Sequence, residues 1–201
     1  MSVYDVIVVG GGASGMMAAG RAAELGKKVL LLEKNRRLGE KLRISGGGRC
    51  NITNAEFDVR QFIQAYGKAE QFLYSTFAQF GVQDTFSFFE ARGLPLVVQA
   101  RKRAFPQTEK AADVARVLEA YMKKGGVEVR TSAPVTRIET DAAGAIAAVY
   151  CDKKHYAQLP MSLLPAECLT QRPARLATGL PGLPNLVIQL KSPRRPLCLW
   201  R

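Results

Sequence analysis

A glycine-rich turn between a short apolar strand and a helix constrains this chain more than any other feature. Residues 4–9 form a β-branched run typical of a buried strand, and Gly-Gly-Gly-Ala-Ser-Gly follows at 10–15. Residues 16–25 are rich in Ala and Met, which predicts a helix packed closely on a sheet, and residues 28–33 form a second apolar run. This order predicts a parallel βαβ unit with a right-handed crossover.

The spacing within the turn matches a site for a dinucleotide. Gly10 permits the tight turn, Gly12 lacks the Cβ that would block a pyrophosphate, and Gly15 lets the helix approach the strand. The first turn of the helix offers free N–H groups to a phosphate. Glu33 ends the second strand, where a carboxylate accepts hydrogen bonds from ribose hydroxyls. The alternative is a glycine-rich turn beside a solvated glutamate, but the complete strand–turn–helix context favours the dinucleotide site.

The following loop indicates which dinucleotide binds. Glu33 suits the ribose of FAD or NAD equally well and argues against the additional phosphate of NADP. Residues 34–54 form a polar loop that is too long for a mere connection, and it contains a second glycine triplet at 46–48 with Ser, Arg and Asn beside it. A nicotinamide site does not need this second triplet, whereas a long flavin does. We therefore predict FAD as the cofactor.

These residues also carry a family resemblance. The stretch GGGASG, followed by LLEKNRRLGEKLRISGGGRCNITN, resembles the BaiN-like (aminoacetone-oxidase-like) family of bacterial FAD-dependent oxidoreductases. The segment Arg103-Ala104-Phe105-Pro106 is similar to that family's linker into the next helix. The resemblance covers about residues 4–156, roughly the first third of a usual family member. It implies hydride transfer through flavin N5, with NAD(P)H as the electron partner.

The resemblance also implies which residues contact FAD. The ADP half would lie on the first turn and the end of the second strand, at Gly10, Gly12, Ala13, Ser14, Gly15, Glu33 and Lys34. The flavin side would lie along the second loop, at Lys41, Ser45, Gly46, Gly47, Gly48, Arg49 and Asn51, and the backbone of Val135 would pair with the adenine edge. Neither the residues nor the resemblance names a catalytic acid or base, and no metal site is expected.

The remaining patterns complete an α/β prediction: a Rossmann-type, glutathione-reductase-like parallel sheet, incomplete, with a small β-meander. Helical patterns cover 59–66, 69–80 and 84–91, and residues 94–99 and 104–105 suggest a hairpin. Thr108 is expected to cap a helix that ends at Lys124, and residues 127–131 are expected to form a third strand of the main sheet. A second hairpin is predicted over 135–140 and 145–151. The predicted buried stripe of the long helix is Ala112, Ala115, Val117, Leu118 and Tyr121.

The last quarter of the chain departs from the family pattern. Seven of the ten prolines fall between Pro160 and Pro196. Codons can be chosen for residues 159–179 so that the same bases, read two nucleotides later, spell Ala-Asn-Val-Ile-Val-Ala-Ser-Gly-Met-Ser-Tyr-Pro-Ala-Thr-Gly-Ser-Thr-Gly-Asp-Gly. That is the family's own segment, short by one glycine. We interpret residues 158–201 as an unstructured, out-of-frame tail that follows an FAD-binding domain at 1–157, and a genuine proline-rich basic tail is the alternative.

The frameshift interpretation has two structural consequences. Deleting residues 158–201 is not expected to lower stability, because a proline-rich basic segment buries little apolar area. The main sheet would lack the strand that should read Ala-Asn-Val-Ile-Val-Ala, which would leave an apolar edge open beside 6–9 or 127–129. The activity of this truncated chain is correspondingly in doubt.

Charge and cysteine content limit the expected partners and compartment. The net charge is +12, but residues 1–150 hold 21 Lys and Arg against 15 Asp and Glu, so the body is only mildly basic and no specific nucleic-acid partner is expected. Four dispersed cysteines, no CxxC, no signal segment and no long apolar run predict a cytoplasmic protein without a membrane partner. The expected substrate is an unidentified small molecule. A flavin-dependent RNA-modifying enzyme and a non-enzymatic nucleotide-binding fragment remain as alternative functions.

Overall fold

The computed structural model describes residues 4–140, 142, 146–151, 154–155 and 186–189. The chain divides into two compact units. Among the described residues, unit 1 contains 4–38, 122–155 with its gaps, and 186–189, and unit 2 contains 39–121. Each unit is described by itself.

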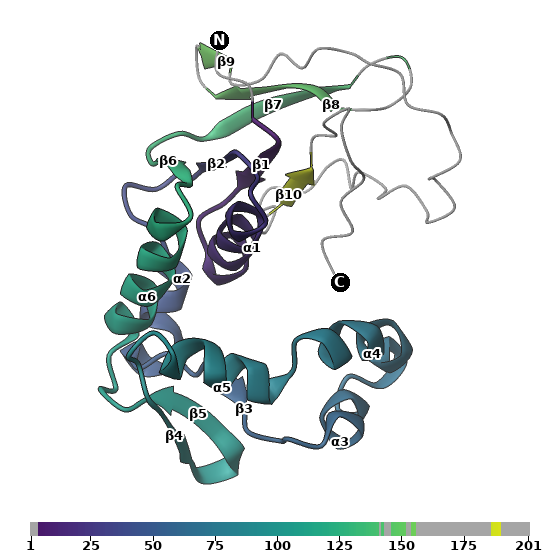
Figure 1. The fold of residues 1–201 in the computed structure, drawn as a ribbon, viewed down its shortest axis with the longest axis vertical. Helices are drawn as coiled ribbons and strands as arrows, with labels where there is room; N and C mark the ends of the chain where they lie inside the picture. The colour runs from purple at the N-terminus through teal and green to yellow at the C-terminus, as the bar shows by residue number, and fades with distance from the viewer. Residues whose placement is uncertain (1–3, 141, 143–145, 152–153, 156–185, 190–201) are drawn as a thin grey trace. The chain divides into compact units, whose positions relative to one another are not determined.

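The main sheet lies in unit 1 and is largely parallel (Figure 1). Strands β1 (Val6–Val9), β2 (Val29–Leu32) and β6 (Glu128–Arg130) are parallel neighbours in that order. Helix α1 (Ala13–Glu24) connects β1 to β2 and packs against both strands. The parallel βαβ unit predicted from the glycine turn is confirmed, and so is the Rossmann-type α/β fold.

The burial of β1 and β2 explains their unbroken apolar sequences. All four residues of β2 are buried, as are the first three of β1, because both faces of the sheet are covered. On one side, α1 buries its small and apolar residues, including Met16 and Ala19. On the other side, the apolar cluster of the sheet includes residues of a separate antiparallel β-meander, among them Val149 and Cys151.

The meander was predicted as a hairpin and contains a further short strand. Strands β7 (Val135–Thr140), β8 (Ile146–Cys151) and β9 (Lys154–His155) pair antiparallel in sequence order. Irregular pairing interrupts β7–β8 between Val135 and Arg137. The predicted small β-meander is therefore confirmed, with His155 in its last strand.

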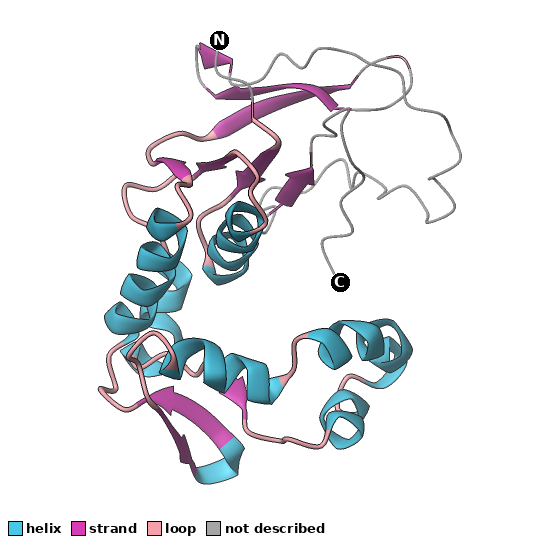
Figure 2. Cartoon of the chain, in the orientation of Figure 1, coloured by secondary structure: helices cyan, strands magenta, loops and turns pink. Residues whose placement is uncertain are grey.

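Unit 2 combines short helices with a small antiparallel sheet (Figure 2). Strands β3 (Thr53–Asn54), β5 (Arg103–Pro106) and β4 (Leu96–Gln99) pair in that spatial order, which confirms the predicted hairpin and adds one strand to it. The short 3-10 helices cover Ser45–Gly48, Gly67–Ala69 and Ala100–Lys102. The α-helices are α2 (Glu40–Ile44), α3 (Val59–Gln64), α4 (Glu70–Gln79), α5 (Val82–Glu90) and α6 (Ala111–Lys124), whose last three residues belong to unit 1.

The structure corrects the start and the register of the long helix. Helix α6 begins at Ala111. Thr108 lies before it in a turn, in which the N–H of Glu109 donates to the carbonyl of Pro106 at 2.8 Å. The predicted helix cap at Thr108 is wrong. Ala112 is exposed, so its place in the buried stripe is wrong as well, and Ala111 is buried instead. Ala115, Leu118 and Tyr121 are buried as predicted, whereas Val117 is only partly buried.

The predicted tail contributes one described strand. Strand β10 (Leu186–Gln189) pairs antiparallel with β1, with Ile188 opposite Ile7, and becomes the strand beside β1 at one edge of the sheet. The expectation that the edge beside residues 6–9 is open is therefore wrong in this structure. Among the described residues β6 is the last strand on the other side of the sheet, which agrees with the second place expected for an open edge, beside 127–129. The predicted boundary between 157 and 158 lies outside the described residues, so the proposed domain limits and the frameshift remain predictions.

Candidate dinucleotide site

The first turn has the backbone geometry that its glycines suggest. Gly10 adopts a φ of +100°, which favours glycine, and its N–H donates to the carbonyl of Leu32 at 2.7 Å. A Cβ added to Gly15 would fall inside the contact distance of the Gly10 carbonyl oxygen, which is a backbone atom that cannot move aside alone. The close approach of strand β1 and helix α1 therefore requires glycine at position 15.

The first turn of helix α1 leaves its backbone N–H groups open to an anion. Gly12 is its extended N-cap residue and provides no side-chain acceptor for the first N–H groups. Ala13 and Ser14 follow it and are exposed. The N-terminal N–H groups and the positive end of the helix dipole suit a phosphate. The residues present in this turn thus fit the diphosphate of a dinucleotide.

Glu33 is a buried carboxylate that braces the same turn. Its side chain directly follows β2, and the residue is 6% exposed. Its Oε2 accepts a hydrogen bond from the N–H of Gly11 at 2.5 Å, and its Oε1 accepts one from the N–H of Asn35 at 2.8 Å. The carboxylate that was predicted to hold a ribose therefore lies next to the glycine turn, as a dinucleotide site requires.

Sequence reasoning missed the residues that support Glu33. A Cβ on Gly11 would overlap the side chain of Leu38, which is buried against the turn. The N–H of Ala133 donates to the carbonyl of Glu33 at 2.8 Å, and that of Ser132 to Asn35 at 2.9 Å. Gly11 could have been identified from the sequence, because it is the middle glycine of the first triplet. Nothing in the local sequence points to residues 132–133, which lie about a hundred residues away.

The second glycine triplet forms a left-handed loop in unit 2. Gly46, Gly47 and Gly48 have φ values of +57°, +67° and +82°. A Cβ on Gly46 would lie 2.7 Å from the backbone nitrogen of Asn51, whereas Cβ atoms on the other two would meet nothing within 4 Å. The Ser45 hydroxyl donates to the carbonyl of Leu42 at 2.8 Å and so ties the loop to α2. Gly47 and Gly48 therefore present an open backbone that a ligand can approach closely.

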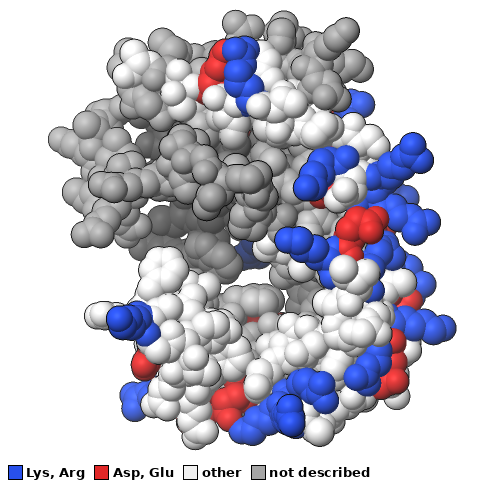
Figure 3. Space-filling model, turned by 180° about the vertical axis from the view of Figure 1, so that it is seen from behind, with Lys and Arg blue, Asp and Glu red and all other residues white. Residues whose placement is uncertain are grey.

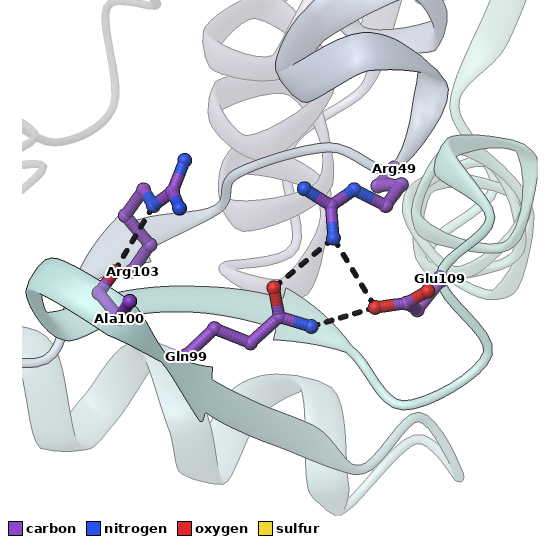
Figure 4. A network of polar contacts seen from close by, with 5 residues as sticks. All are labelled: Arg49, Gln99, Ala100, Arg103 and Glu109. Atoms are coloured by element: carbon purple, nitrogen blue, oxygen red, sulfur yellow. Dashed lines mark hydrogen bonds and ion pairs between the residues drawn. The ribbon is translucent and has the colours of Figure 1, made fainter.

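The other predicted residues of this half differ in their surroundings. Lys41 and Asn51 are exposed. Arg49 donates from Nη1 to the Oε1 atoms of Gln99, at 3.0 Å, and Glu109, at 3.2 Å (Figure 4). Cys50 is buried, and this burial raises the pKa of its thiol, only partly opposed by a hydrogen bond with Ser45. A thiol of this kind is a packed side chain and a poor nucleophile.

The predicted site residues fall into two sets. Unit 1 contains the ADP set (Gly10, Gly12–Gly15, Glu33 and Lys34) and the partly buried Val135 at the start of β7. Unit 2 contains Lys41, the loop from Ser45 to Arg49, and Asn51. The glycines and Glu33 of the first set lie together around the start of α1. The side chain of Lys34, the residue after Glu33, is exposed. Cofactor contact by either set remains a prediction.

Across the described ranges, no three His, Cys, Asp or Glu side chains gather as metal ligands, and no helix is long and apolar enough to cross a bilayer. On the face in Figure 3, lysines and arginines are spread widely along one side, with aspartates and glutamates in a few places among them.

Comparison with known proteins agrees with this geometry. A family model described as the HI0933-like protein Rossmann domain matches residues 4–161. The chain belongs to this family. Two curated relatives are similar to this chain in sequence. A 3-dehydro-bile acid delta(4,6)-reductase from Clostridium scindens is 32% identical over 139 residues, covering 68% of this chain and 33% of the relative. A ribosomal RNA dihydrouridine synthase from Escherichia coli K12 is 28% identical over 144 residues, covering 72% and 35%.

Solved structures support the fold of the HI0933-like domain. A 3-ketosteroid-delta4-(5alpha)-dehydrogenase from Rhodococcus jostii RHA1 superposes with a TM-score of 0.57 at 20% identity, covering 76% of this chain and 43% of that one. A flavocytochrome c3 fumarate reductase gives a TM-score of 0.51, also at 20% identity, with coverages of 75% and 30%. At this identity the likeness shows the fold alone. The chain spans about a third of the length of the two curated relatives described above.

Proposed function

We propose that this chain carries the FAD-binding part of an FAD-dependent oxidoreductase of the BaiN-like type. The observation that carries the proposal is the buried Glu33 carboxylate, hydrogen-bonded to Gly11 within the glycine turn that precedes α1. The reductase among the relatives supports the reaction class. The second glycine triplet favours a flavin dinucleotide over a nicotinamide one, because it offers a second stretch of open backbone.

Each residue set has a definite task in this proposal. The N–H groups at the start of α1 hold the diphosphate, and Glu33 accepts hydrogen bonds from the ribose hydroxyls. The loop at 45–51 receives the flavin side, and the backbone of Val135 pairs with the adenine edge. Bound FAD supplies a hydride acceptor and donor at N5, and NAD(P)H is the proposed electron donor. A small-molecule substrate and a cytoplasmic location complete the proposal.

The test is a titration of the purified full-length chain with FAD, followed by the visible spectrum and the quenching of flavin fluorescence. Gly12→Val is expected to abolish binding, because a branched side chain fills the space of the diphosphate. Glu33→Ala is expected to weaken it by about 1–3 kcal/mol. Glu24→Ala is the matched control, since that glutamate is exposed at the far end of α1, where it pairs with Arg21 across one turn of the helix. Equal affinities in all four proteins would refute the site.

A second candidate function is the modification of RNA. Two relatives, from Escherichia coli and Haemophilus influenzae, are named ribosomal RNA dihydrouridine synthases, and the net charge of this chain is +12. RNA binding that weakens steeply as salt rises would favour this candidate, because phosphate contacts release counterions. A chain that keeps no yellow colour once added, unbound FAD has been removed by gel filtration would instead favour a non-enzymatic nucleotide-binding fragment.

A further inference from the structure

Arg49 is held in a fixed orientation by two side chains that are distant in the sequence. Its Nη1 donates to Gln99 Oε1 at 3.0 Å and to Glu109 Oε1 at 3.2 Å, and Gln99 Nε2 donates to the same Glu109 oxygen at 2.6 Å. These contacts form a closed triangle (Figure 4). An arginine loses side-chain freedom when both acceptors are themselves connected, so the triangle specifies one position for the guanidinium.

The ring of Phe105 supports the flat face of the same guanidinium. Phe105 is 1% exposed, and Cζ of Arg49 lies 4.4 Å from the centre of its ring. Arg103 also approaches this ring, at 5.6 Å, while its Nε donates to the carbonyl of Ala100. Two guanidinium groups thus gather around one buried ring. Glu109 is the carboxylate that pairs with the first of them.

The remaining donors of Arg49 are available to another group. Among the described residues, the structure provides no hydrogen-bond partner for Nε or Nη2, and Figure 4 shows the second terminal nitrogen pointing away from Gln99 and Glu109. The side chain is 36% exposed. Arg49 also directly follows Gly47 and Gly48, where nothing fills the space that a Cβ would take.

We propose that Gln99 and Glu109 are positioning residues that present Arg49 to an oxyanion, a phosphate or carboxylate group, of a ligand at the second glycine triplet. The inference rests on the proposed binding of a flavin dinucleotide, and it assigns to this loop a cation whose orientation is set before the ligand arrives. Glu109 accepts a hydrogen bond from one edge of the Arg49 guanidinium, and Gln99 hydrogen-bonds to both Arg49 and Glu109. The ring of Phe105 fixes the plane of the guanidinium. The free edge then offers parallel N–H donors, which match an oxyanion.

The experiment measures FAD affinity in a double-mutant cycle of the full-length chain, with Arg49→Gln, Gln99→Leu and the combined variant. Arg49→Gln is expected to weaken FAD binding about tenfold or more. Gln99→Leu is expected to weaken it several-fold when Arg49 is present and not at all when it is absent. Gln83→Leu is the matched control, because Gln83 is exposed on α5 and hydrogen-bonds only to Ser87 in the same helix. If Arg49→Gln weakens FAD binding and Gln99→Leu weakens it by the same factor whether or not Arg49 is present, the positioning role is overturned.

A second measurement does not depend on FAD. The Arg49 Nε–H signal is followed by nuclear magnetic resonance while inorganic pyrophosphate is added. The wild-type side chain is expected to be ordered and to shift with pyrophosphate, whereas Gln99→Leu loses that order. If no protein binds FAD but this response is seen, the proposed function fails and the inference stands. If the wild-type signal is as mobile as that of Gln99→Leu, or does not respond, the inference is overturned even where FAD binds.

The oxyanion could belong to the cofactor or to a separate anionic ligand. Binding of riboflavin, which lacks phosphate groups, distinguishes these two sources. An effect of Arg49→Gln on FAD affinity but not on riboflavin affinity assigns the oxyanion to the diphosphate of the cofactor, as a contact additional to those proposed for the N–H groups at the start of α1. A pyrophosphate response without an effect on either flavin assigns it to a separate anionic ligand. Both results support the role of the arginine.

Discussion

At the residue scale, the glycines of the first turn act through the backbone positions that they permit. Gly10 supplies a positive φ, and Gly15 leaves room for the carbonyl of Gly10. Their spacing was readable from the sequence because the same local geometry recurs wherever a strand turns into a phosphate-binding helix. Gly47 and Gly48 of the second triplet supply a positive φ as well, but a Cβ at either position would meet nothing.

Gly15→Ala is expected to lower the free energy of unfolding by about 2–3 kcal/mol, because its Cβ meets a backbone oxygen that only a shift of the turn can relieve. Gly47→Ala should cost only about 1 kcal/mol, since its Cβ meets nothing and only the positive φ is unfavourable. Urea denaturation of both variants checks the order. A larger loss at position 47 would show that the close approach at Gly15 is not as described.

Tyr150 is expected to ionise above its ordinary range. Its hydroxyl donates to Glu139 at 2.6 Å, and this hydrogen bond raises the pKa of the phenol, with a smaller contribution from burial. A raised pKa in the folded state stabilises the fold below the unfolded value, and this contribution is lost as pH rises through the folded pKa. Ultraviolet titration of the phenolate in wild type and Glu139→Gln checks the shift. Identical curves would contradict the contact.

Residue roles became harder to predict as their partners became more distant. Glu33 was identified from its place at the end of β2, but its support by Ala133 depends on a turn that follows β6. Arg49 was identified as a site residue, whereas Gln99 and Glu109, 50 and 60 residues away, carry no local signal. Hydrogen bonds between distant segments follow from the tertiary fold, which local patterns do not contain.

At the element scale, strong periodicity predicted the helices and strands well, and weak periodicity did not. The unbroken apolar runs of β1 and β2 were recognised, and so were Ala115, Leu118 and Tyr121 of the buried stripe of α6. Helix α2, with five residues, and β3, with two, were missed inside a segment interpreted as a polar loop. Elements this short bury too few residues to leave a periodic pattern, and their formation depends on tertiary contacts.

The register of α6 provides a direct test with a built-in control. Ala115 is fully buried, whereas Ala112, three residues earlier, is exposed. Ala115→Asp is therefore expected to destabilise the protein severely, because it buries an unpaired carboxylate, while Ala112→Asp should change stability by less than about 0.5 kcal/mol. Thermal unfolding monitored by circular dichroism compares the two. Similar losses of stability in the two variants would indicate that Ala112 is buried, as the sequence predicted.

At the scale of the whole molecule, the order of the parallel strands followed from the βαβ pattern, but the edge of the sheet did not. Composition predicted that the last 44 residues contribute nothing, yet β10 lies antiparallel to β1. Strand addition at an edge uses backbone groups that every segment possesses. Proline content and charge are therefore a poor guide to whether a four-residue segment pairs.

Deletion of residues 158–201 is accordingly expected to speed hydrogen exchange at amides of Val6–Val9 that pair with β10. Amides of β5, which pairs on both sides within unit 2, serve as the internal control and should exchange at an unchanged rate. Mass spectrometry of peptides from both proteins gives the comparison. If β1 exchanges equally in the two chains, the β10 pairing makes no contribution to its protection in solution.

The brace between Glu33 and the glycine turn has a consequence for how quickly a ligand can bind. The Gly11 and Asn35 amides already hold the carboxylate in place, so little conformational entropy would be lost on binding the ribose that we propose for it. A receptor of this kind works by lock and key: association is limited by encounter and not by rearrangement. A loop that must first assemble its carboxylate would bind the same nucleotide more slowly, even if it reached equal affinity.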